Sequence, residues 1–422
     1  MKIQRYLTPT AAPLSGRDLL RGCLGLFHGR AVRATREAEF ARYFGVKYAF
    51  ALSSGKAALT TILQACAAVS PRRKVIIPAY TCFSVPSAVV RAGCEVVPCD
   101  VDPETLDYRF SDLQALVNDE VLCVVSPHLL GQAADITRVK EIARPYGIPV
   151  VEDAAQAMGG AQEGRRLGTQ ADVGFFSLGR GKNVTAGSGG IILTNADWLG
   201  DALAKRCQEI PEAPWGSRVR ACIEAVVTAL LIHPLLYWLP AGLPGLGLGD
   251  TKFEPDFPLH RLDSMRASLL AGWQSRLECS NAERLHRSQD LLDVAQGWIG
   301  MLGPDRRRVT VYLRVPVILP TAEMKVRACH LSAEMGLGVS GLYPSPVSDI
   351  PAVRMSCGNR RFPGAQVLAE RLVTCPVHHY VTHQDIVLVI GALRRVIDEA
   401  AGSSRQASVS SAGASPAVKM EA

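Results

Sequence analysis

Residues 150–195 read VVEDAAQAMGGAQEGRRLGTQADVGFFSLGRGKNVTAGSGGIILTN, and this stretch decides the fold class. It contains short, mostly apolar runs of the kind that form strands covered on both faces of a sheet. Similar runs come before it in the chain. The expected strands are Lys74–Ile77, Glu95–Cys99, Val121–Ser126, Pro149–Glu152, Val173–Ser177 and Gly190–Thr194.

Helix-like segments separate these runs. Gly55–Ala68 is rich in Ala and Leu, Ser84–Ala92 is amphipathic, and Asp135–Tyr146 ends before a glycine that suits a helix C-terminus. Alternation of strands and helices predicts an α/β fold with a mostly parallel sheet.

A second α/β unit is expected in the C-terminal half. Its elements are a strand over residues 309–319 and helices over Ala322–Met335 and His383–Ala400. A chain of 422 residues exceeds the usual size of one core. We therefore expect a large domain over residues 1–255, a smaller one over 256–400, and a disordered Ser/Ala-rich tail over 401–422.

Composition narrows the class of protein. Hydrophobic residues make up 48% of the chain and charged residues 20%, and the net charge of +7 is spread along the chain. This mild excess suits phosphate-bearing small molecules or an anionic membrane surface as well as nucleic acid, and we expect no nucleic-acid partner. The twelve cysteines show no CxxC spacing, which predicts buried thiols and no metal site. The N-terminus shows no signal-peptide pattern, so we expect a cytoplasmic protein.

One stretch, residues 225–249, is unusual because it contains no charged residue. It reads AVVTALLIHPLLYWLPAGLPGLGLG and reaches the ~20 residues that a membrane span needs. Its three prolines and four glycines would leave backbone polar groups unpaired in lipid. We expect a buried subunit or domain interface here, with a shallow peripheral contact at the inner membrane face as the alternative.

Asp153 follows a predicted strand at its carboxyl end. Open parallel sheets bind their ligands outside the carboxyl ends of the strands. An acidic residue at this point can also cap the following helix, so Asp153 alone does not identify a site.

Lys182 lies 29 residues after Asp153, in a loop between two predicted strands, and five glycines surround it, the last of which begins the second strand. The glycines indicate a backbone that turns sharply and approaches another group closely. A solvated surface charge explains this setting poorly. Ser177 ends the preceding strand, where its hydroxyl could reach a phosphate.

A third element is the Ser-Ser-Gly turn at residues 53–55, which leads into an Ala-rich helix. Backbone N–H groups at a helix N-terminus form a phosphate site, although the same turn is also common as an ordinary cap. Together the three elements supply what pyridoxal 5′-phosphate requires: a carboxylate for the pyridine nitrogen, a lysine for the Schiff base and proton transfer, and a phosphate site. The patterns of a P-loop and of a nicotinamide-binding Rossmann domain are absent from the sequence.

The chain resembles the DegT-type nucleotide-sugar aminotransferases, which are fold type I pyridoxal phosphate enzymes. The resemblance covers about residues 15–400 and implies a large domain with a mostly parallel sheet and a smaller C-terminal α/β domain. It rests on SSGKAAL, IIPAYTCFSVPSAVVRAGCEVVPCDVDPETL, VEDAAQAMGG, FFSLGRGKNVTAGSGGIILTN, GVSGLYPSP and LVTCPVHHYVTHQDI.

The resemblance also implies the roles of individual residues. Lys182 is expected to bind the cofactor covalently, Asp153 to contact the pyridine nitrogen, and Gln156 to lie at the hydroxyl side of the ring. Ser177 and the turn at Ser54 are expected to hold the phosphate. The full expected set is Lys182 and Asp153 as catalytic residues, with Ser54, Gly55, Lys56, Asp153, Gln156, Ser177, Lys182 and Asn183 binding the cofactor.

Several positions depart from the family's pattern. Lys56 stands where a hydroxyl residue usually lies beside the phosphate. Cys82 occupies a position that often holds an aromatic residue stacked on the ring, with Tyr80 or Phe83 as nearby substitutes. Ser188 replaces the usual acid of the Gly-rich turn.

The resemblance implies a homodimer that transfers an amino group, commonly from L-glutamate, to a nucleotide-linked keto-sugar. Ser345 and Pro346 replace a Leu-His pair that lines the substrate pocket in many relatives, so the particular sugar is not inferred. Two alternatives stay open: a sugar dehydratase or lyase with the same cofactor, and a low-turnover scaffold at a polysaccharide assembly. The presence of Lys182 favours transamination, because family dehydratases tend to replace this lysine.

Overall fold

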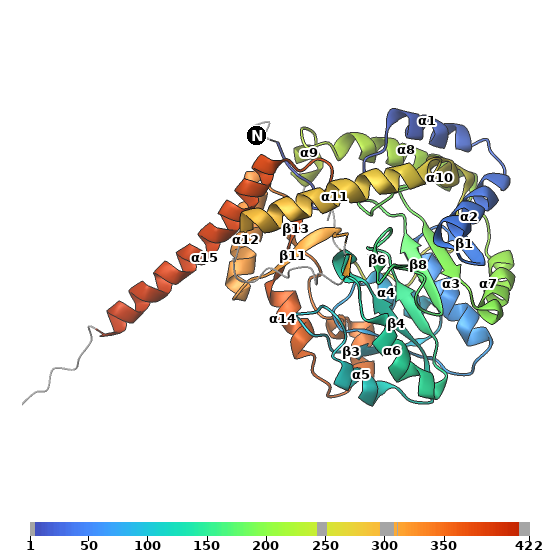
Figure 1. Cartoon of the computed structure of the whole chain (residues 1–422), viewed down its shortest axis with the longest axis horizontal. Coiled ribbons are helices and arrows are strands. Elements are labelled where there is room, and N and C mark those ends of the chain that lie inside the picture. The colour runs from blue at the N-terminus through green and yellow to red at the C-terminus, as the bar shows by residue number, and fades with distance from the viewer. Residues whose placement is uncertain (1–4, 243–250, 296–307, 310, 413–422) are drawn as a thin grey trace, which may run out of the picture.

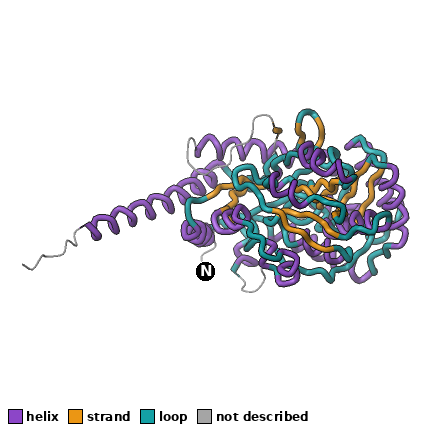
Figure 2. The backbone as a smooth tube through the Cα atoms, turned by 90° about the horizontal axis from the view of Figure 1, so that it is seen from below, coloured by secondary structure: helices purple, strands orange, loops and turns teal. Residues whose placement is uncertain are grey.

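The computed structural model of this chain describes residues 5–242, 251–295, 308–309 and 311–412. A seven-stranded sheet lies between layers of helices in the larger part of the molecule (Figures 1 and 2). All of its neighbouring strands are parallel except β9, which runs antiparallel to both of its neighbours. In order across the sheet, the strands are β1 (Tyr48–Leu52), β9 (Gly190–Thr194), β8 (Val173–Ser177), β5 (Val150–Asp153), β4 (Val121–Pro127), β2 (Lys74–Pro78) and β3 (Glu95–Cys99).

All six strands expected from the sequence are confirmed, each to within one residue at either end. The seventh strand, β1, was not expected. Its sequence, YAFAL, contains two alanines, which are depleted in strands, so the local pattern is weak. The strand forms because all five of its residues pair with β9.

Helices bury both faces of this sheet, as expected for parallel strands. On one face Val75 and Ile77 pack with α3 (Gly55–Ala68), α4 (Ser84–Arg91) and α7 (Asp197–Glu209). On the other face Ile76, Val124 and Val150 pack with α5 (Phe110–Leu116) and α6 (Ile136–Ala143). Farther along that second face, the helices are α2 (Ala31–Phe44), α10 (Ser264–Leu269) and the first turns of α11 (Trp273–Ala295).

A three-stranded antiparallel sheet forms the second core. Its strands, in order, are β11 (Arg314–Ile318), β13 (Leu372–Pro376) and β12 (Ser340–Gly341). It packs against α12 (Ala322–Met335), α15 (His383–Ala412) and the last turns of α11. Two short helices, α13 (Pro351–Cys357) and α14 (Pro363–Arg371), return to the core of the large sheet. A small hairpin, β6 (Ala161–Gln162) and β7 (Arg165–Arg166), pairs with β10 (Arg308–Val309).

The C-terminal elements agree with the sequence in part. The helix expected at Ala322–Met335 is confirmed, and the strand expected over 309–319 is shorter, at Arg314–Ile318. The last helix does not stop at Ala400 but continues to Ala412, and it extends away from the rest of the molecule (Figure 1). Residues 413–422 of the expected tail lie outside the described residues. The division near residue 255 stays a prediction.

The apolar stretch is only partly buried. Its described part spans the end of α8 (Trp215–Leu231) and α9 (Trp238–Ala241), and residues 243–249 lie outside the described residues. Ala225, Pro234 and Pro240 are buried, but Leu230, Leu235, Leu236 and Leu239 are exposed. These four leucines are therefore not buried by a domain interface among the described residues, while burial against a second subunit stays a prediction. No helix among the described residues is long and apolar enough to cross a bilayer.

Candidate active site

The predicted functional residues come together at the carboxyl ends of the central strands. Asp153 is the last residue of β5 and Ser177 the last of β8, and these two strands are parallel neighbours. β1 ends close by, and the Ser-Ser-Gly turn after it starts α3. Pairing of β9 with both β1 and β8 thus brings the start of α3 next to the end of β8.

A cavity of about 250 Å³ lies at this edge. Seven of the eight residues expected to bind the cofactor line it: Ser54, Gly55, Lys56, Asp153, Gln156, Ser177 and Lys182. The eighth, Asn183, is not among the lining residues. Its side-chain amide donates to Asn281 of α11 at 2.9 Å, and Asn281 donates to the Met158 carbonyl at 3.0 Å. Asn183 therefore fixes the loop behind Lys182 instead of lining the cavity.

Lys182 and Asp153 both line the cavity, and each acts on the pKa of the other. Burial lowers the pKa of Lys182, the nearby Cys82 and Asp153 oppose that shift, and the charge of Arg314 adds to it. Burial likewise raises the pKa of Asp153, against the Ala155 N–H that donates to it at 3.0 Å and the charge of Lys182. A depressed lysine pKa favours the neutral amine, which is the form that reacts with an aldehyde.

The start of α3 forms the opposite end of the cavity. Ser54 is the N-cap of α3, and its hydroxyl accepts the Ala57 N–H at 3.0 Å. A Cβ atom at Gly55 would lie 3.1 Å from the Ser177 Cβ, so any larger residue would require Ser177 to shift where α3 begins next to β8. The first backbone N–H groups of a helix have no intrahelical acceptor, and Ser54, Gly55 and Lys56 at this end of α3 line the cavity.

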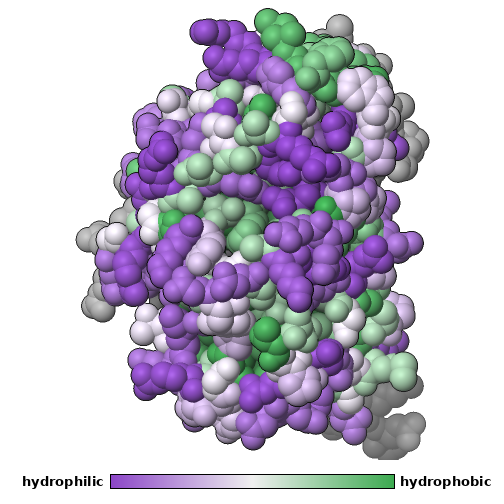
Figure 3. All heavy atoms as spheres, turned by 90° about the vertical axis from the view of Figure 1, so that its right-hand side faces the viewer, coloured by the Kyte–Doolittle hydropathy of each residue, from purple (hydrophilic) through white to green (hydrophobic). Residues whose placement is uncertain are grey.

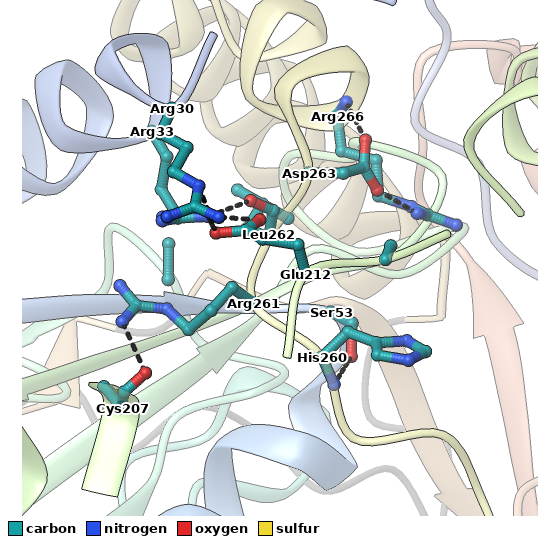
Figure 4. Close-up of polar contacts among 12 residues, drawn as sticks. Arg30, Arg33, Ser53, Cys207, Glu212, His260, Arg261, Leu262, Asp263 and Arg266 are labelled. Atoms are coloured by element: carbon teal, nitrogen blue, oxygen red, sulfur yellow. Dashed lines mark hydrogen bonds and ion pairs between the residues drawn. The ribbon is translucent and has the colours of Figure 1, made fainter. Parts of the chain in front are cut away.

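Neighbouring segments hold this turn in place. The Ser188 hydroxyl donates to the Ser53 carbonyl at 2.8 Å, and a Cβ atom at Gly190 would lie 2.4 Å from the Ser54 carbonyl. On the other side the Ser53 hydroxyl accepts the His260 N–H at 3.3 Å (Figure 4). Ser188, which stands where the family pattern has an acid, thus contributes to the turn through its hydroxyl.

Gln156 and Tyr343 form another part of the cavity wall. Gln156 accepts the Leu130 N–H at 2.8 Å and donates to the Tyr343 hydroxyl at 2.9 Å. Cys82 lines the cavity as well, with its sulfur 3.3 Å from the Thr251 hydroxyl. Tyr80 is fully buried and its hydroxyl accepts the Tyr343 N–H at 3.2 Å. Tyr80 therefore supports Tyr343 from behind instead of replacing the missing aromatic at Cys82.

The side chain of Lys56 already has other partners than a phosphate. Its ammonium lies 3.6 Å from the Glu254 carboxylate and 4.7 Å from the centre of the Phe257 ring. Both partners belong to the segment before α10, which packs over the cavity wall. The backbone of Lys56 still lies in the first turn of α3, and cofactor binding through it stays a prediction.

Sequence reasoning missed His128, which follows β4 at the same edge and lines the cavity. Its Nδ1 accepts the Ala134 N–H at 2.9 Å, so its Nε2 carries the proton that it shares with Glu152 at 2.7 Å. Burial alone would raise the pKa of Glu152, but His128 and backbone N–H groups of residues 168–171 hold that pKa below its ordinary value. His128 comes directly after a parallel strand, but this position alone does not reveal its contact with Glu152.

Arg314, the first residue of β11, was also missed. Its guanidinium donates to the hydroxyls of Ser340 and Thr374, both at 3.2 Å, and its Nε is buried without a hydrogen-bond partner. Among the described residues no carboxylate pairs with it, although its charge is close enough to lower the pKa of Lys182. No sequence motif points to Arg314, because only the fold brings β11 near Lys182.

Comparison with known proteins gives the same family as the motifs. Residues 25–213 match the model of the DegT/DnrJ/EryC1/StrS aminotransferase family. GDP-perosamine synthase from Vibrio cholerae is 32% identical over 165 residues, 39% of this chain and 45% of that protein. The chain spans less than half the length of this and several other curated relatives.

Two other proteins match this chain over a larger share of its length. PseC of Helicobacter pylori, an aminotransferase involved in the biosynthesis of pseudoaminic acid, has the same fold, with a TM-score of 0.75 over 93% of this chain and 100% of that one at 14% identity. L-glutamine:2-deoxy-scyllo-inosose aminotransferase from Streptomyces kanamyceticus is 37% identical over 326 residues, 74% of this chain and 69% of that protein. This chain therefore belongs to the DegT/DnrJ/EryC1/StrS aminotransferase family.

Proposed function

We propose that this protein is a pyridoxal phosphate-dependent aminotransferase that moves an amino group from an amino acid, L-glutamate, to a nucleotide-linked keto-sugar, and that it works as a homodimer. The observation that carries this proposal is the cavity in which Lys182, Asp153 and the N-terminus of α3 meet. The cofactor is the one that enzymes of this family use.

The residues of the cavity fit this cofactor. An aldehyde needs an amine with a lowered pKa, which Lys182 supplies. A pyridinium nitrogen needs a buried carboxylate, and Asp153 lines the cavity with one oxygen bonded to the Ala155 N–H. A phosphate needs N–H and hydroxyl donors, and Gly55, Ser54 and Ser177 lie together at the other end. When bound, pyridoxal phosphate supplies an electron sink for the carbon that loses a proton.

The side chains of this chain then do the remaining work. Lys182 holds and passes a proton at its Nζ, which its lowered pKa makes easier near neutral pH. Asp153 keeps a proton on the ring nitrogen through the negative charge that it places beside it. Gln156 is fixed by hydrogen bonds at both ends of its amide, so it orients the ring side without moving.

Arg314 supports an amino-acid donor. Arg314 is half-buried, its charge acts on Lys182, and its only side-chain partners among the described residues are two hydroxyls. Its guanidinium is therefore short of an anion, and a carboxylate is the anion that pairs best with it. Every α-amino acid carries such a carboxylate next to the amine that is transferred. We therefore assign Arg314 to the donor's α-carboxylate.

The choice of a sugar acceptor is supported by the names of the relatives. One is a GDP-perosamine synthase, while another acts on 2-deoxy-scyllo-inosose, a cyclic ketone without a nucleotide. Both names describe amination of a polyhydroxylated ring. We choose a nucleotide-linked sugar as the acceptor because the name of the first relative includes a nucleotide.

A spectroscopic experiment tests the proposal. The purified protein with pyridoxal phosphate is mixed with L-glutamate, and the absorbance of the bound cofactor is followed before a set of nucleotide keto-sugars is added with nitrogen-labelled glutamate. We expect the spectrum to convert to that of the pyridoxamine form and the label to enter one sugar. An unchanged spectrum supports the scaffold alternative, and loss of hydroxyl without label supports a dehydratase.

A further inference from the structure

Two helices at one edge of the molecule form a surface that the proposed chemistry does not use. α1 (Gly16–Gly25) and α8 lie next to each other (Figure 1). The sulfurs of Cys23 and Cys222 are 3.2 Å apart, and the ring centres of Phe27 and Trp215 are 6.0 Å apart. The end of α1 thus contacts the start of α8, so the two helices are antiparallel neighbours.

The outer side of this pair exposes large apolar side chains at helical spacing. We call these residues the α1/α8 face. They are Leu20 and Leu24 on α1, Phe27 just after it, and Trp215, Ile223, Val227 and Leu230 on α8. Their exposed fractions run from 45% for Val227 to 80% for Phe27. Figure 3 shows hydrophobic residues gathered at the top of the molecule, the side on which α1 lies in Figure 1. A contiguous apolar surface of this kind usually contacts a partner or a membrane.

The inner sides of α1 and α8 pack against the core beneath the large sheet. Gly22 approaches the Leu269 side chain and Gly25 approaches Ser268, both on or next to α10. On α8, Ala221, Cys222 and Ala225 join the core beneath the sheet. Since folding buries the inner residues, the outward leucines are not needed for the core.

The start of α8 is also held firmly. Glu212, three residues before the helix, pairs with Arg33 at 2.8 Å and with Arg30 at 3.4 Å (Figure 4). Arg33 also donates to the Leu262 carbonyl at 3.2 Å. The α1/α8 face is therefore carried on a fixed support.

The charges around this face are mainly positive. Residues 16–30 and 215–231 contain five arginines and two acids. Of the acids, Asp18 is buried and Glu224 pairs with Arg220 at 2.8 Å. Arg17 and Arg21 are exposed one turn apart beside the leucines of α1. Leucines with Trp and Phe on one side and arginines at the border are typical of helices that lie in a membrane interface.

A second copy of the chain is a poorer partner for the same face. A two-fold contact would bring two copies of this mainly positive surface together, and like charges across an interface oppose binding. Anionic lipid headgroups supply the opposite charge, and the acyl boundary accepts the leucines. We propose that the α1/α8 face rests on an anionic membrane surface, which holds the enzyme there as a peripheral protein.

Flotation of the full-length protein with lipid vesicles tests this proposal independently of catalysis. We expect the protein to float with phosphatidylcholine vesicles that contain phosphatidylglycerol and to stay below vesicles of phosphatidylcholine alone. The pair Leu24→Asp and Val227→Asp should abolish flotation. Replacing Arg17 and Arg21 by Gln should weaken binding about fivefold for each arginine at low salt. Val326→Asp is the matched control, because Val326 is 70% exposed on α12, away from the face, and should float like the wild type.

Light scattering of the same proteins separates lipid from a second copy. We expect the wild type and the Leu24→Asp, Val227→Asp variant to have the same mass in solution. A drop in mass for that variant would assign the face to a subunit contact and overturn the proposal. Absence of flotation in the wild type, or equal flotation of wild type and variant, would overturn it as well.

Discussion

The cavity edge of the large sheet and the α1/α8 face depart from ordinary burial in opposite directions. At the cavity edge Asp153, Glu152 and Lys182, which are charged side chains, are buried or nearly so. On the α1/α8 face, leucines and aromatic side chains lie in solvent. Buried charges and exposed apolar groups are both costly, so each arrangement points to a ligand that removes the cost.

The two regions differ in how the rest of the chain supports them. Two of the buried charges are held by specific contacts: Glu152 by His128, and Asp153 by the Ala155 N–H. In the part of the chain that the structure describes, the exposed apolar groups have no polar contacts of this kind and are supported by the helices beneath them. Substitutions at the cavity edge should therefore change chemistry, while those on the α1/α8 face should change location and leave chemistry and folding intact.

The largest effect is expected for Lys182→Ala. This change removes both the amine that binds the cofactor and the group that moves the proton, so turnover should fall by several orders of magnitude. Borohydride reduction of the wild type followed by peptide mapping should place the label on Lys182. A label on Lys56, whose ammonium pairs with Glu254, would contradict the central assignment.

Asp153→Asn should have the next largest effect. The amide keeps the shape of the carboxylate but loses the charge that keeps the ring nitrogen protonated. We expect the rate to fall about 100-fold, the scale of losing one partner of a developing charge, while the cofactor still binds. Titration of the cofactor by fluorescence, alongside steady-state rates, measures the two quantities. An Asn variant with near wild-type rate would reduce Asp153 to a residue that only holds the following turn through the Ala155 N–H.

Arg314→Met should act mainly on the amino donor. Loss of a charged hydrogen-bonding partner should raise the KM for L-glutamate about 10- to 100-fold, with a smaller change in the KM for the sugar. Arg314→Lys serves as the control, because it keeps the charge but loses the forked geometry. Equal effects of Arg314→Met on both substrates would argue for a structural role.

The same variant gives a prediction for pH. The positive charge of Arg314 lowers the pKa of Lys182, so its removal should raise that pKa. The neutral amine is the reactive form and becomes more abundant as pH rises. The pH midpoint for cofactor capture by the apoprotein should therefore lie below 10.5 in the wild type and move upward in Arg314→Met. Arg314→Lys should leave the midpoint nearly unchanged.

Much of the fold could be predicted because its signals are local. The strands of residues 74–194 are short apolar runs between glycines and polar turns, and each could be recognised by itself. β1 was missed because its alanines carry little strand preference and its pairing partner, β9, lies about 140 residues away. The last helix was ended too early at Ala400, since the Ser- and Ala-rich sequence after it has no apolar periodicity.

The site could be predicted where one motif contains both position and chemistry, as at Asp153 and Lys182. His128 and Arg314 were missed because their chemistry arises only from their surroundings: His128 becomes notable beside Glu152, and Arg314 beside Lys182. Asn183 was assigned to the cofactor because it follows Lys182, yet its side chain turns to Asn281. Exposure of the apolar residues on the α1/α8 face is likewise a property of the fold, and the sequence alone does not distinguish it from burial.

The smallest expected effect is on the free energy of unfolding, and it compares an exposed leucine of the α1/α8 face with a leucine buried beneath the large sheet. Leu63 is fully buried in α3 beneath the sheet, and Leu20 is 61% exposed on α1. Leu63→Ala removes a side chain and leaves a cavity, which should lower the free energy of unfolding by about 2–5 kcal/mol. Leu20→Ala removes the same atoms from water-exposed surface and should change it by about 0.5 kcal/mol or less. Denaturant unfolding of both variants with cofactor bound measures the difference. A Leu20 variant as unstable as the Leu63 variant would mean that the α1/α8 face is part of the core of a larger assembly, because only groups that are buried in the unfolding species contribute on that scale.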